Sequence, residues 1–107
     1  MATYTNVSYA VKNVSTSGSA VTTVSSGTLA ISSLVLSNTS TSPITVNVYI
    51  TRSATNYYLV YQATVPVGGS LEAIQGNRVI LQTSDALYVL ASAATSCDAW
   101  ASALSVV

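Results

Sequence analysis

The sequence of 107 residues contains no histidine and has only three acidic and three basic residues. Histidine is the most common general base and metal ligand, so its absence excludes Ser-His-Asp and Cys-His catalytic arrangements. The acids Glu72, Asp85 and Asp98 are scattered along the chain, whereas a glycosidase needs two converging carboxylates and a calcium site needs several. We therefore expect no enzyme activity, no cofactor and no metal site, and interpret Asp85 as a turn residue.

Cysteine is nearly absent as well. The single Cys97 excludes an internal disulfide and indicates synthesis in a reducing cytosol. Because the adjacent Asp98 would raise the pKa of its thiol, we interpret Cys97 as a small buried hydrophobic residue rather than a nucleophile.

Charge is also scarce, at 6% of the residues with a formal net charge of zero. This gives no electrostatic basis for binding nucleic acid or an anionic membrane, and it favours association of copies with one another. No uninterrupted apolar run approaches the roughly 20 residues of a membrane span. The first twelve residues lack the basic region of a signal peptide, so we expect no export.

The sequence is rich in short runs with a period of two, which is typical of β-strands. The most regular run places Ile44, Val46, Val48 and Ile50 on one face, which we expect to be buried. An apolar run over 29–36 precedes it, and the polar segment 38–43 contains the Asn, Ser and Pro residues that favour a chain reversal. These three segments predict a central β-hairpin.

Other runs predict further strands over 3–12, 20–26, 57–65, 71–74, 78–82, 86–92 and 97–107, with a loop over 52–56 and a tight turn over 75–77. In the last run Trp100, Leu104 and Val106 share one face, and we expect Trp100 in the core. The alanine-rich segment 91–104 could also form a helix, but the interleaved Ser, Thr and Asp residues favour a strand.

The spacing of these strands predicts an all-β fold, a single antiparallel β-sandwich or jelly-roll-like domain of about eight short strands over residues 1–107. An alternative for residues 1–17 is an extended N-terminal arm that reaches a neighbouring subunit.

Tyrosines are the one positive surface feature, and we identify Tyr49, Tyr57, Tyr58 and Tyr61 as candidate interface residues. Tyrosine is enriched at protein interfaces and on sugar-stacking platforms. Strict alternation would place Tyr57 and Tyr61 on one face of their strand and Tyr58 on the other. The alternative is that the rings pack over the rim of the sandwich with their hydroxyls in water.

Three segments carry a resemblance to a known class of proteins: LVLSNTSTSPITVNVYI at 34–50, VPVGGS at 65–70 and DALYVLAS at 85–92. In these the chain resembles small β-sandwich virion structural proteins of tailed bacteriophages, namely capsid decoration or cement proteins and neck or tail components. The resemblance implies a non-enzymatic structural protein that binds the capsid surface and stabilises it.

The partners implied are the major capsid protein or other virion proteins, and the location implied is the virion surface after synthesis in the host cytoplasm. The resemblance also implies a homo-oligomer, preferably a trimer. An alternative in the same class is a neck, tail or fibre-attachment component. An alternative of another class is a carbohydrate-binding module, which would require Tyr57, Tyr61 or Trp100 to be exposed and coplanar.

Overall fold

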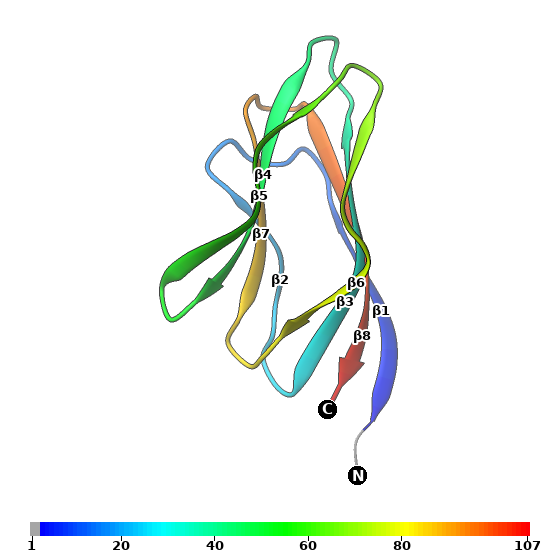
Figure 1. Cartoon of the computed structure of the whole chain (residues 1–107), viewed down its shortest axis with the longest axis vertical. Coiled ribbons are helices and arrows are strands. Elements are labelled where there is room, and N and C mark those ends of the chain that lie inside the picture. The colour runs from blue at the N-terminus through cyan, green and yellow to red at the C-terminus, as the bar shows by residue number, and fades with distance from the viewer. Residues whose placement is uncertain (1–2) are drawn as a thin grey trace.

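The computed structural model describes residues 3–107, apart from the side chains of residues 75–77, and this part of the chain contains strands but no helix. Figure 1 labels eight strands: β1 (Tyr4–Val11), β2 (Ser19–Thr23), β3 (Thr28–Asn38), β4 (Ile44–Arg52), β5 (Thr55–Val65), β6 (Ser70–Leu81), β7 (Ala86–Ala91) and β8 (Cys97–Val106).

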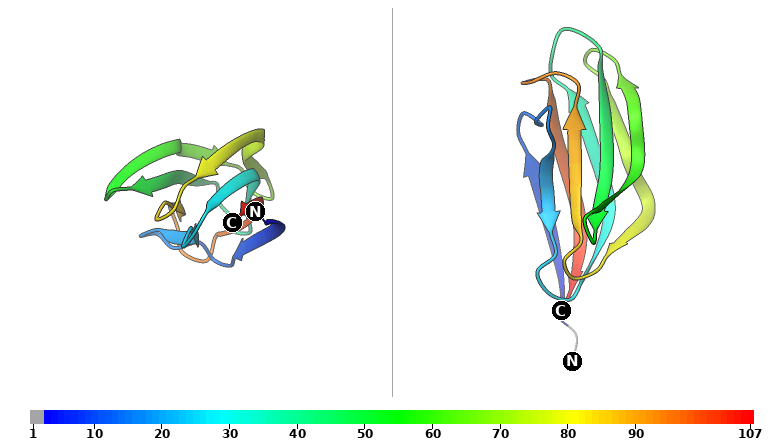
Figure 2. Two further views of the ribbon diagram at one scale, coloured as in Figure 1. Left: turned by 90° about the horizontal axis from the view of Figure 1, so that it is seen from below. Right: turned by 90° about the vertical axis from the view of Figure 1, so that its left-hand side faces the viewer.

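The strands form two four-stranded sheets, one in the order β1-β8-β3-β6 and the other in the order β2-β7-β4-β5. Neighbouring strands in both sheets are antiparallel. Most consecutive strands lie in opposite sheets, which is the arrangement of a jelly roll. The two sheets face each other along the long axis of the molecule (Figure 2), which measures 49 × 26 × 21 Å. The predicted all-β sandwich is confirmed.

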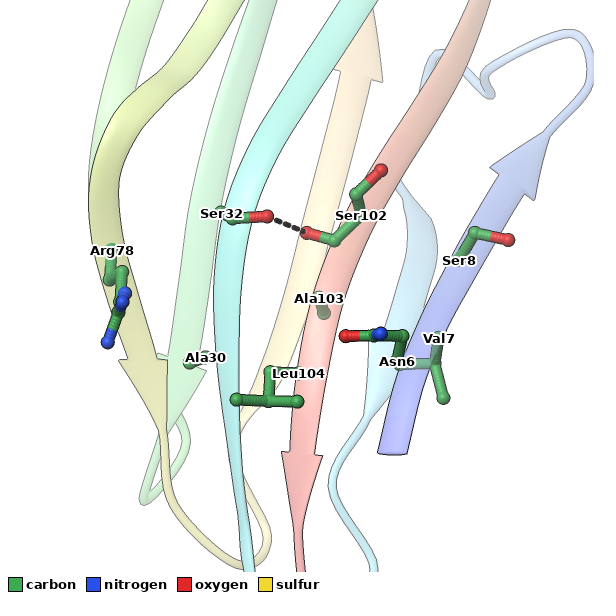
Figure 3. Close-up of a pocket in the computed structure, with 9 residues that line it drawn as sticks. All are labelled: Asn6, Val7, Ser8, Ala30, Ser32, Arg78, Ser102, Ala103 and Leu104. Carbon is green, nitrogen blue, oxygen red and sulfur yellow. Dashed lines mark hydrogen bonds between the residues drawn. The ribbon is translucent and has the colours of Figure 1, made fainter. Parts of the chain in front are cut away.

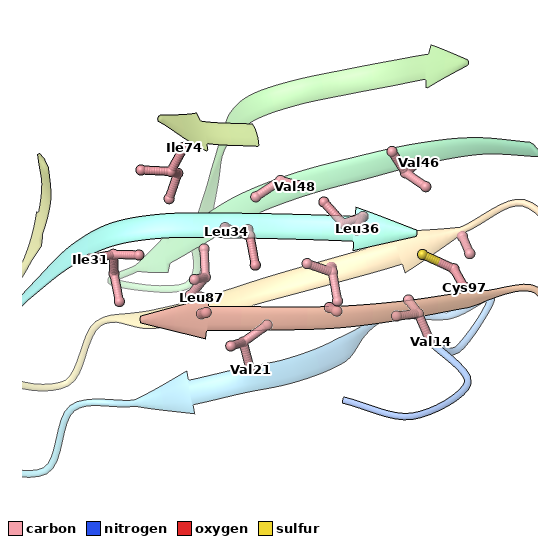
Figure 4. Packing of buried hydrophobic residues seen from close by; sticks show 14 of the residues in the cluster. Val14, Val21, Ile31, Leu34, Leu36, Val46, Val48, Ile74, Leu87 and Cys97 are labelled. Atoms are coloured by element: carbon pink, nitrogen blue, oxygen red, sulfur yellow. The ribbon is translucent and has the colours of Figure 1, made fainter. Parts of the chain in front are cut away.

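A single cluster of buried side chains fills the space between the sheets (Figure 4). On β4 the side chains of Ile44, Val46 and Val48 are buried as predicted, and Ile50 is half-buried near the end of the strand. On β3 the inward set comprises Leu29, Ile31, Leu34 and Leu36. The period of two therefore identifies the core face of β4. On β3 a bulge between Ile31 and Ser33 shifts the alternation, so that Ile31 and Leu34 both face inward.

The inward face of β8 consists of small residues, and this differs from the sequence prediction. Cys97, Ala99, Ala101 and Ala103 are buried, whereas Trp100 lies on the outer face and is 56% exposed. The prediction of Trp100 in the core is wrong because β8 is a central strand of its sheet. Sheets pack about 10 Å apart, so small residues on one side accommodate large aliphatic residues on the other.

The predicted hairpin between β3 and β4 is also wrong, since these strands belong to opposite sheets and residues 39–43 cross between them. The true hairpin joins β4 to β5 through Ser53 and Ala54, whose φ angles of 52° and 63° suit a type I′ turn. The loop predicted over 52–56 is therefore only a two-residue turn.

Asn38 fixes the crossing from β3 to β4. Its buried amide Nδ2 donates to the carbonyl oxygens of Ser42 at 2.9 Å and Val65 at 3.1 Å, and its Oδ1 accepts from the backbone N–H of Ser40 at 2.9 Å. The backbone N–H of Asn38 donates to the carbonyl of Gly69 at 3.0 Å. Asn38 thus ties this crossing to the one between β5 and β6, at the upper end of the molecule in Figure 1.

Two further expectations are corrected by the strand pairing. Residues 75–77 lie within β6, where the register against β3 shifts between Ile31 and Ser33, so a bulge replaces the predicted turn. The N-terminal segment pairs with the chain's own β8, from Tyr4 opposite Val106 to Val11 opposite Ala99. This pairing satisfies the backbone groups of β1 that face β8, so residues 4–11 form an edge strand of this sheet rather than an extended arm.

We expect Asn38→Ala to lower the free energy of unfolding by about 1–3 kcal/mol, because it leaves buried backbone groups without their partners. Urea denaturation measures this change. The matched control is Asn56→Ala, at an exposed position of β5, which should change stability by less than about 0.5 kcal/mol. Equal effects at the two positions would show that Asn38 does not hold the crossing.

Candidate interaction surface

Four tyrosines form a connected aromatic cluster on the outer face of the sheet β2-β7-β4-β5. Tyr49 on β4 lies directly opposite Tyr58 on β5 and Tyr88 on β7, and cross-strand partners project to the same face. The Tyr49 and Tyr88 rings are nearly parallel at 4° with centroids 5.4 Å apart. The Tyr49–Tyr58 and Tyr58–Tyr61 centroid distances are 5.2 and 5.1 Å. We call Tyr49, Tyr58, Tyr61 and Tyr88 the tyrosine cluster.

A bulge in β5 between Tyr58 and Val60 brings Tyr58 and Tyr61 to the same face, and a second bulge follows at Gln62. Relative to β4, the register of β5 shifts on both sides of Val48. At one of these shifts Gln62 adopts a φ of 52°, and its backbone N–H donates to Oδ1 of Asn47 at 2.6 Å. Because a bulge inserts an extra residue, the strict alternation predicted for 57–65 is wrong.

The cluster has a buried base and an exposed top. Tyr49 is only 8% exposed, while Tyr58 and Tyr61 are 47% and 63% exposed. Burial, together with the neighbouring Tyr58 and Tyr88, raises the pKa of Tyr49, so its hydroxyl stays protonated. Gly18 packs against this hydroxyl: a Cβ at Gly18 would lie 2.7 Å from Oη of Tyr49. Tyr49 therefore supports the surface, and any contact made by the cluster uses Tyr58 and Tyr61.

Tyr57 does not belong to the cluster, although the sequence analysis grouped it there. It pairs with Ile50 on β4, whose side chain is half-buried against the core. Tyr57 and Ile50 line a cleft of about 290 Å³ together with Arg52 and Ile80. The predicted set of tyrosines is thus divided between two places. Tyr88, which the sequence analysis did not select, completes the cluster.

The few charged groups are largely neutralised by neighbours within the chain. Nε of Arg52 donates to Oδ1 of Asp85 at 2.9 Å, and the backbone N–H of Gln82 donates to Oδ2 of this carboxylate at 2.8 Å. The hydrogen bond from Arg52 is the main cause that lowers the pKa of the buried Asp85 carboxyl. The predicted turn role of Asp85 is confirmed by the bond from Gln82.

A second ion pair lies on the other sheet. Nζ of Lys12 lies 3.0 Å from Oδ2 of Asp98, and the backbone N–H of Asn13 donates to Oδ1 of Asp98 at 3.0 Å. These bonds lower the pKa of Asp98, the one from Asn13 contributing most.

The described residues show no group of three or more Cys, Asp and Glu side chains that could hold a metal ion. Cys97 is fully buried. Burial, reinforced by the charge of Asp98, raises the pKa of the Cys97 thiol to about 11, so the reactive thiolate is scarce at neutral pH. This agrees with the interpretation of Cys97 as a core residue. No helix in the described part of the chain is long and apolar enough to cross a membrane.

The outer face of the sheet β1-β8-β3-β6 carries an open hollow of about 480 Å³. Short side chains from three adjacent strands, including Ser8, Ala30, Ser32 and Ser102, form its floor (Figure 3). Arg78 lies at its β6 side. We call this site the serine hollow. Trp100 lies on the same face, beside a smaller hollow of about 220 Å³.

Comparison with known proteins gives similarity in fold alone. No family model and no curated protein sequence matches this chain. Among solved structures, a protein of Bacillus endospore appendages, described as a novel family of disulfide-linked pili, is 16% identical over 96% of this chain and 85% of its own, with a TM-score of 0.54. A chain from the T13 particle of the virus IBDV is 11% identical over 98% of this chain and 30% of its own, with a TM-score of 0.42.

We expect stability to be constant from neutral pH to about pH 5 and to fall below about pH 4. The folded-state pKa of Asp85 lies below its unfolded value of about 3.9, so its contribution is lost as the carboxyl becomes protonated. Asp85→Asn should lower the free energy of unfolding at pH 7 by about 1.5–3 kcal/mol and flatten this acid dependence. Thermal denaturation between about pH 2 and 7 measures both effects.

The matched control is Asp98→Asn, whose side chain is 29% exposed compared with 4% for Asp85. Solvent screens the pair at Asp98, so the loss there should be below about 1 kcal/mol. An unchanged acid dependence in Asp85→Asn would contradict this role for the carboxylate.

Proposed function

We propose that this chain is a non-enzymatic structural protein that works within a larger protein assembly. More specifically, we propose a virion protein that binds the capsid surface of a tailed phage and stabilises it. The observation that carries the proposal is the pair of exposed rings, Tyr58 and Tyr61, held in fixed positions on one face of the jelly roll.

The physical basis is that aromatic rings provide contact area at a low entropic cost. Tyrosine loses little side-chain freedom on binding, and its hydroxyl can form a hydrogen bond at the edge of a contact. Here the ring of Tyr49, itself stacked on Tyr88, already packs against Tyr58. A partner therefore meets a surface that is organised before binding, which reduces the cost of association.

The comparisons support the general class rather than the phage assignment. The Bacillus neighbour belongs to a pilus, which is an assembly, and its similarity to this chain concerns the fold. That pilus is described as disulfide-linked, whereas the one cysteine of this chain is buried. Contacts of this chain would accordingly be noncovalent. The phage capsid assignment, the homo-oligomer and the preferred trimer rest on the resemblance in sequence.

Two alternatives differ in their partner. A neck, tail or fibre-attachment component would use the same surface against another virion protein. A carbohydrate-binding module would require Tyr57, Tyr61 or Trp100 to be exposed and coplanar. All three are exposed, but Trp100 lies on the other sheet and Tyr57 lies outside the tyrosine cluster that contains Tyr61. Within the cluster the Tyr49–Tyr58 and Tyr58–Tyr61 planes meet at 44° and 88°. The one parallel pair includes the buried Tyr49. This geometry favours a protein contact, and a glycan array tests the alternative.

We expect the double variant Tyr58→Ser, Tyr61→Ser to bind undecorated phage particles at least about tenfold more weakly than the wild type, because central interface aromatics contribute more than about 1 kcal/mol each. Co-sedimentation with particles at increasing protein concentration measures the affinity. The matched control is Tyr4→Ser, at an exposed tyrosine of the other sheet, which should bind as the wild type does. A double variant that folds and decorates particles normally would refute the role of the cluster.

A further inference from the structure

We infer that the partner of the tyrosine cluster includes a second copy of this chain, whose serine hollow receives Tyr58 and Tyr61. This inference rests on the proposed function, in which the tyrosine cluster is an assembly contact. It adds the identity of the partner and the second surface, on the opposite side of the domain.

The shapes of the two surfaces are complementary. The serine hollow has a volume of about 480 Å³ and is open to solvent, so projecting phenol rings of a neighbour can enter it. It exists because Ala30, Ser32 and Ser102 are short, while Leu104 stands at its end (Figure 3). Tyr58 and Tyr61 are the complementary projecting groups, since their rings are about half exposed on an outer sheet face.

The chemistry of the two surfaces also matches. A tyrosine hydroxyl both donates and accepts, and the hollow offers the side chains of Asn6, Ser8 and Ser102 as partners. Arg78 lines the hollow and forms no ion pair within 4.0 Å in the part of the chain that is described. Its guanidinium can stack on an aromatic ring from a second copy, a contact worth about 0.5–1 kcal/mol when exposed.

Neither surface opposes the contact electrostatically. The serine hollow is lined by no acidic side chain, and the tyrosine cluster has none among its members. The formal net charge of the chain is zero, so two copies experience no overall repulsion.

The available area fits a weak but specific contact. A face of four strands is about 19 Å wide, and eight residues of strand span about 26 Å, which gives about 500 Å² per face. Two such faces bury on the order of 1,000 Å², the lower limit for a specific interface. We therefore expect a Kd in the micromolar range rather than an obligate oligomer.

The two surfaces lie on opposite sheets, so the contact is heterologous. Each copy can receive one neighbour and be received by another, so the copies form a ring, such as the preferred trimer, where the rotation between them closes, and an open stack where it does not. The copy at one end of a stack keeps its tyrosine cluster free. Self-association and binding to a particle are therefore compatible.

The test uses two variants, each of which removes one surface. Tyr58→Ser with Tyr61→Ser removes the projecting rings and leaves the hollow intact. Ser102→Trp fills the hollow and leaves the cluster intact. The outer face of β8 already carries Trp100 two residues away, so a tryptophan at this position is compatible with the strand. Ser70→Trp, on the exposed edge strand β6, is the matched control for bulk.

Sedimentation velocity at concentrations on the order of 1–100 μM, which bracket the expected Kd, gives the result. We expect the wild type and Ser70→Trp to associate with increasing concentration and each surface variant alone to remain monomeric. An equimolar mixture of the two surface variants should form a heterodimer and stop there, because the mixture has one intact cluster facing one intact hollow.

The inference is overturned if the mixture stays monomeric while the wild type associates, if Ser102→Trp associates like the wild type, or if the wild type is monomeric throughout. Binding of the Ser102→Trp variant to particles tests the proposed function separately from self-association. This variant keeps its tyrosine cluster and should decorate particles normally even where self-association is absent.

Discussion

The buried amide of Asn38 joins two of the chain segments that pass between the sheets at one end of the molecule, those from β3 to β4 and from β5 to β6. The sheets have separate hydrogen-bond ladders, so their relation depends on the apolar core and on these crossings. Asn38 is the last residue of β3. Its side-chain amide donates to the carbonyl of Val65, and its backbone N–H donates to the carbonyl of Gly69. A buried amide is costly without partners, and only the jelly-roll path supplies all of them. The tyrosine cluster depends on this path because it places β4 between β5 and β7.

The sequence predicts strands and core faces well where local alternation determines them. The core face of β4 follows directly from the period of two, whereas in β3 a bulge between Ile31 and Ser33 shifts the alternation. The sheet to which each strand belongs depends on long-range bonds, such as that from Asn38 to Val65, 27 residues apart. Turn residues at 38–43 reverse the chain in a hairpin and in a crossing alike, so their composition does not distinguish the two. For β8, both alternating sets contain apolar residues, and the size of the opposing side chains decides that the alanines face inward.

The sequence predicts that tyrosines form the candidate surface, but it does not predict which tyrosines lie on the same face. Three neighbouring tyrosines in one strand indicate an interaction surface, yet the bulge between Tyr58 and Val60 decides which of them share a face. The bulge at Gln62 depends on the side chain of Asn47 from another strand, which no local pattern reveals. Tyr88 joins the cluster through the register of β7 against β4. Its position between the inward residues Leu87 and Val89 was the available signal that it faces outward.

The result is a domain whose outer faces offer aromatic, serine and alanine surface with little charge. Such surfaces serve a protein held by neighbours, because few like charges keep copies apart. The most direct test of this account is imaging, at residue resolution, of purified particles that carry the protein. The account predicts that Tyr58 and Tyr61 lie against a neighbouring protein chain. If both rings face solvent in the assembled particle, the tyrosine cluster is not the assembly contact.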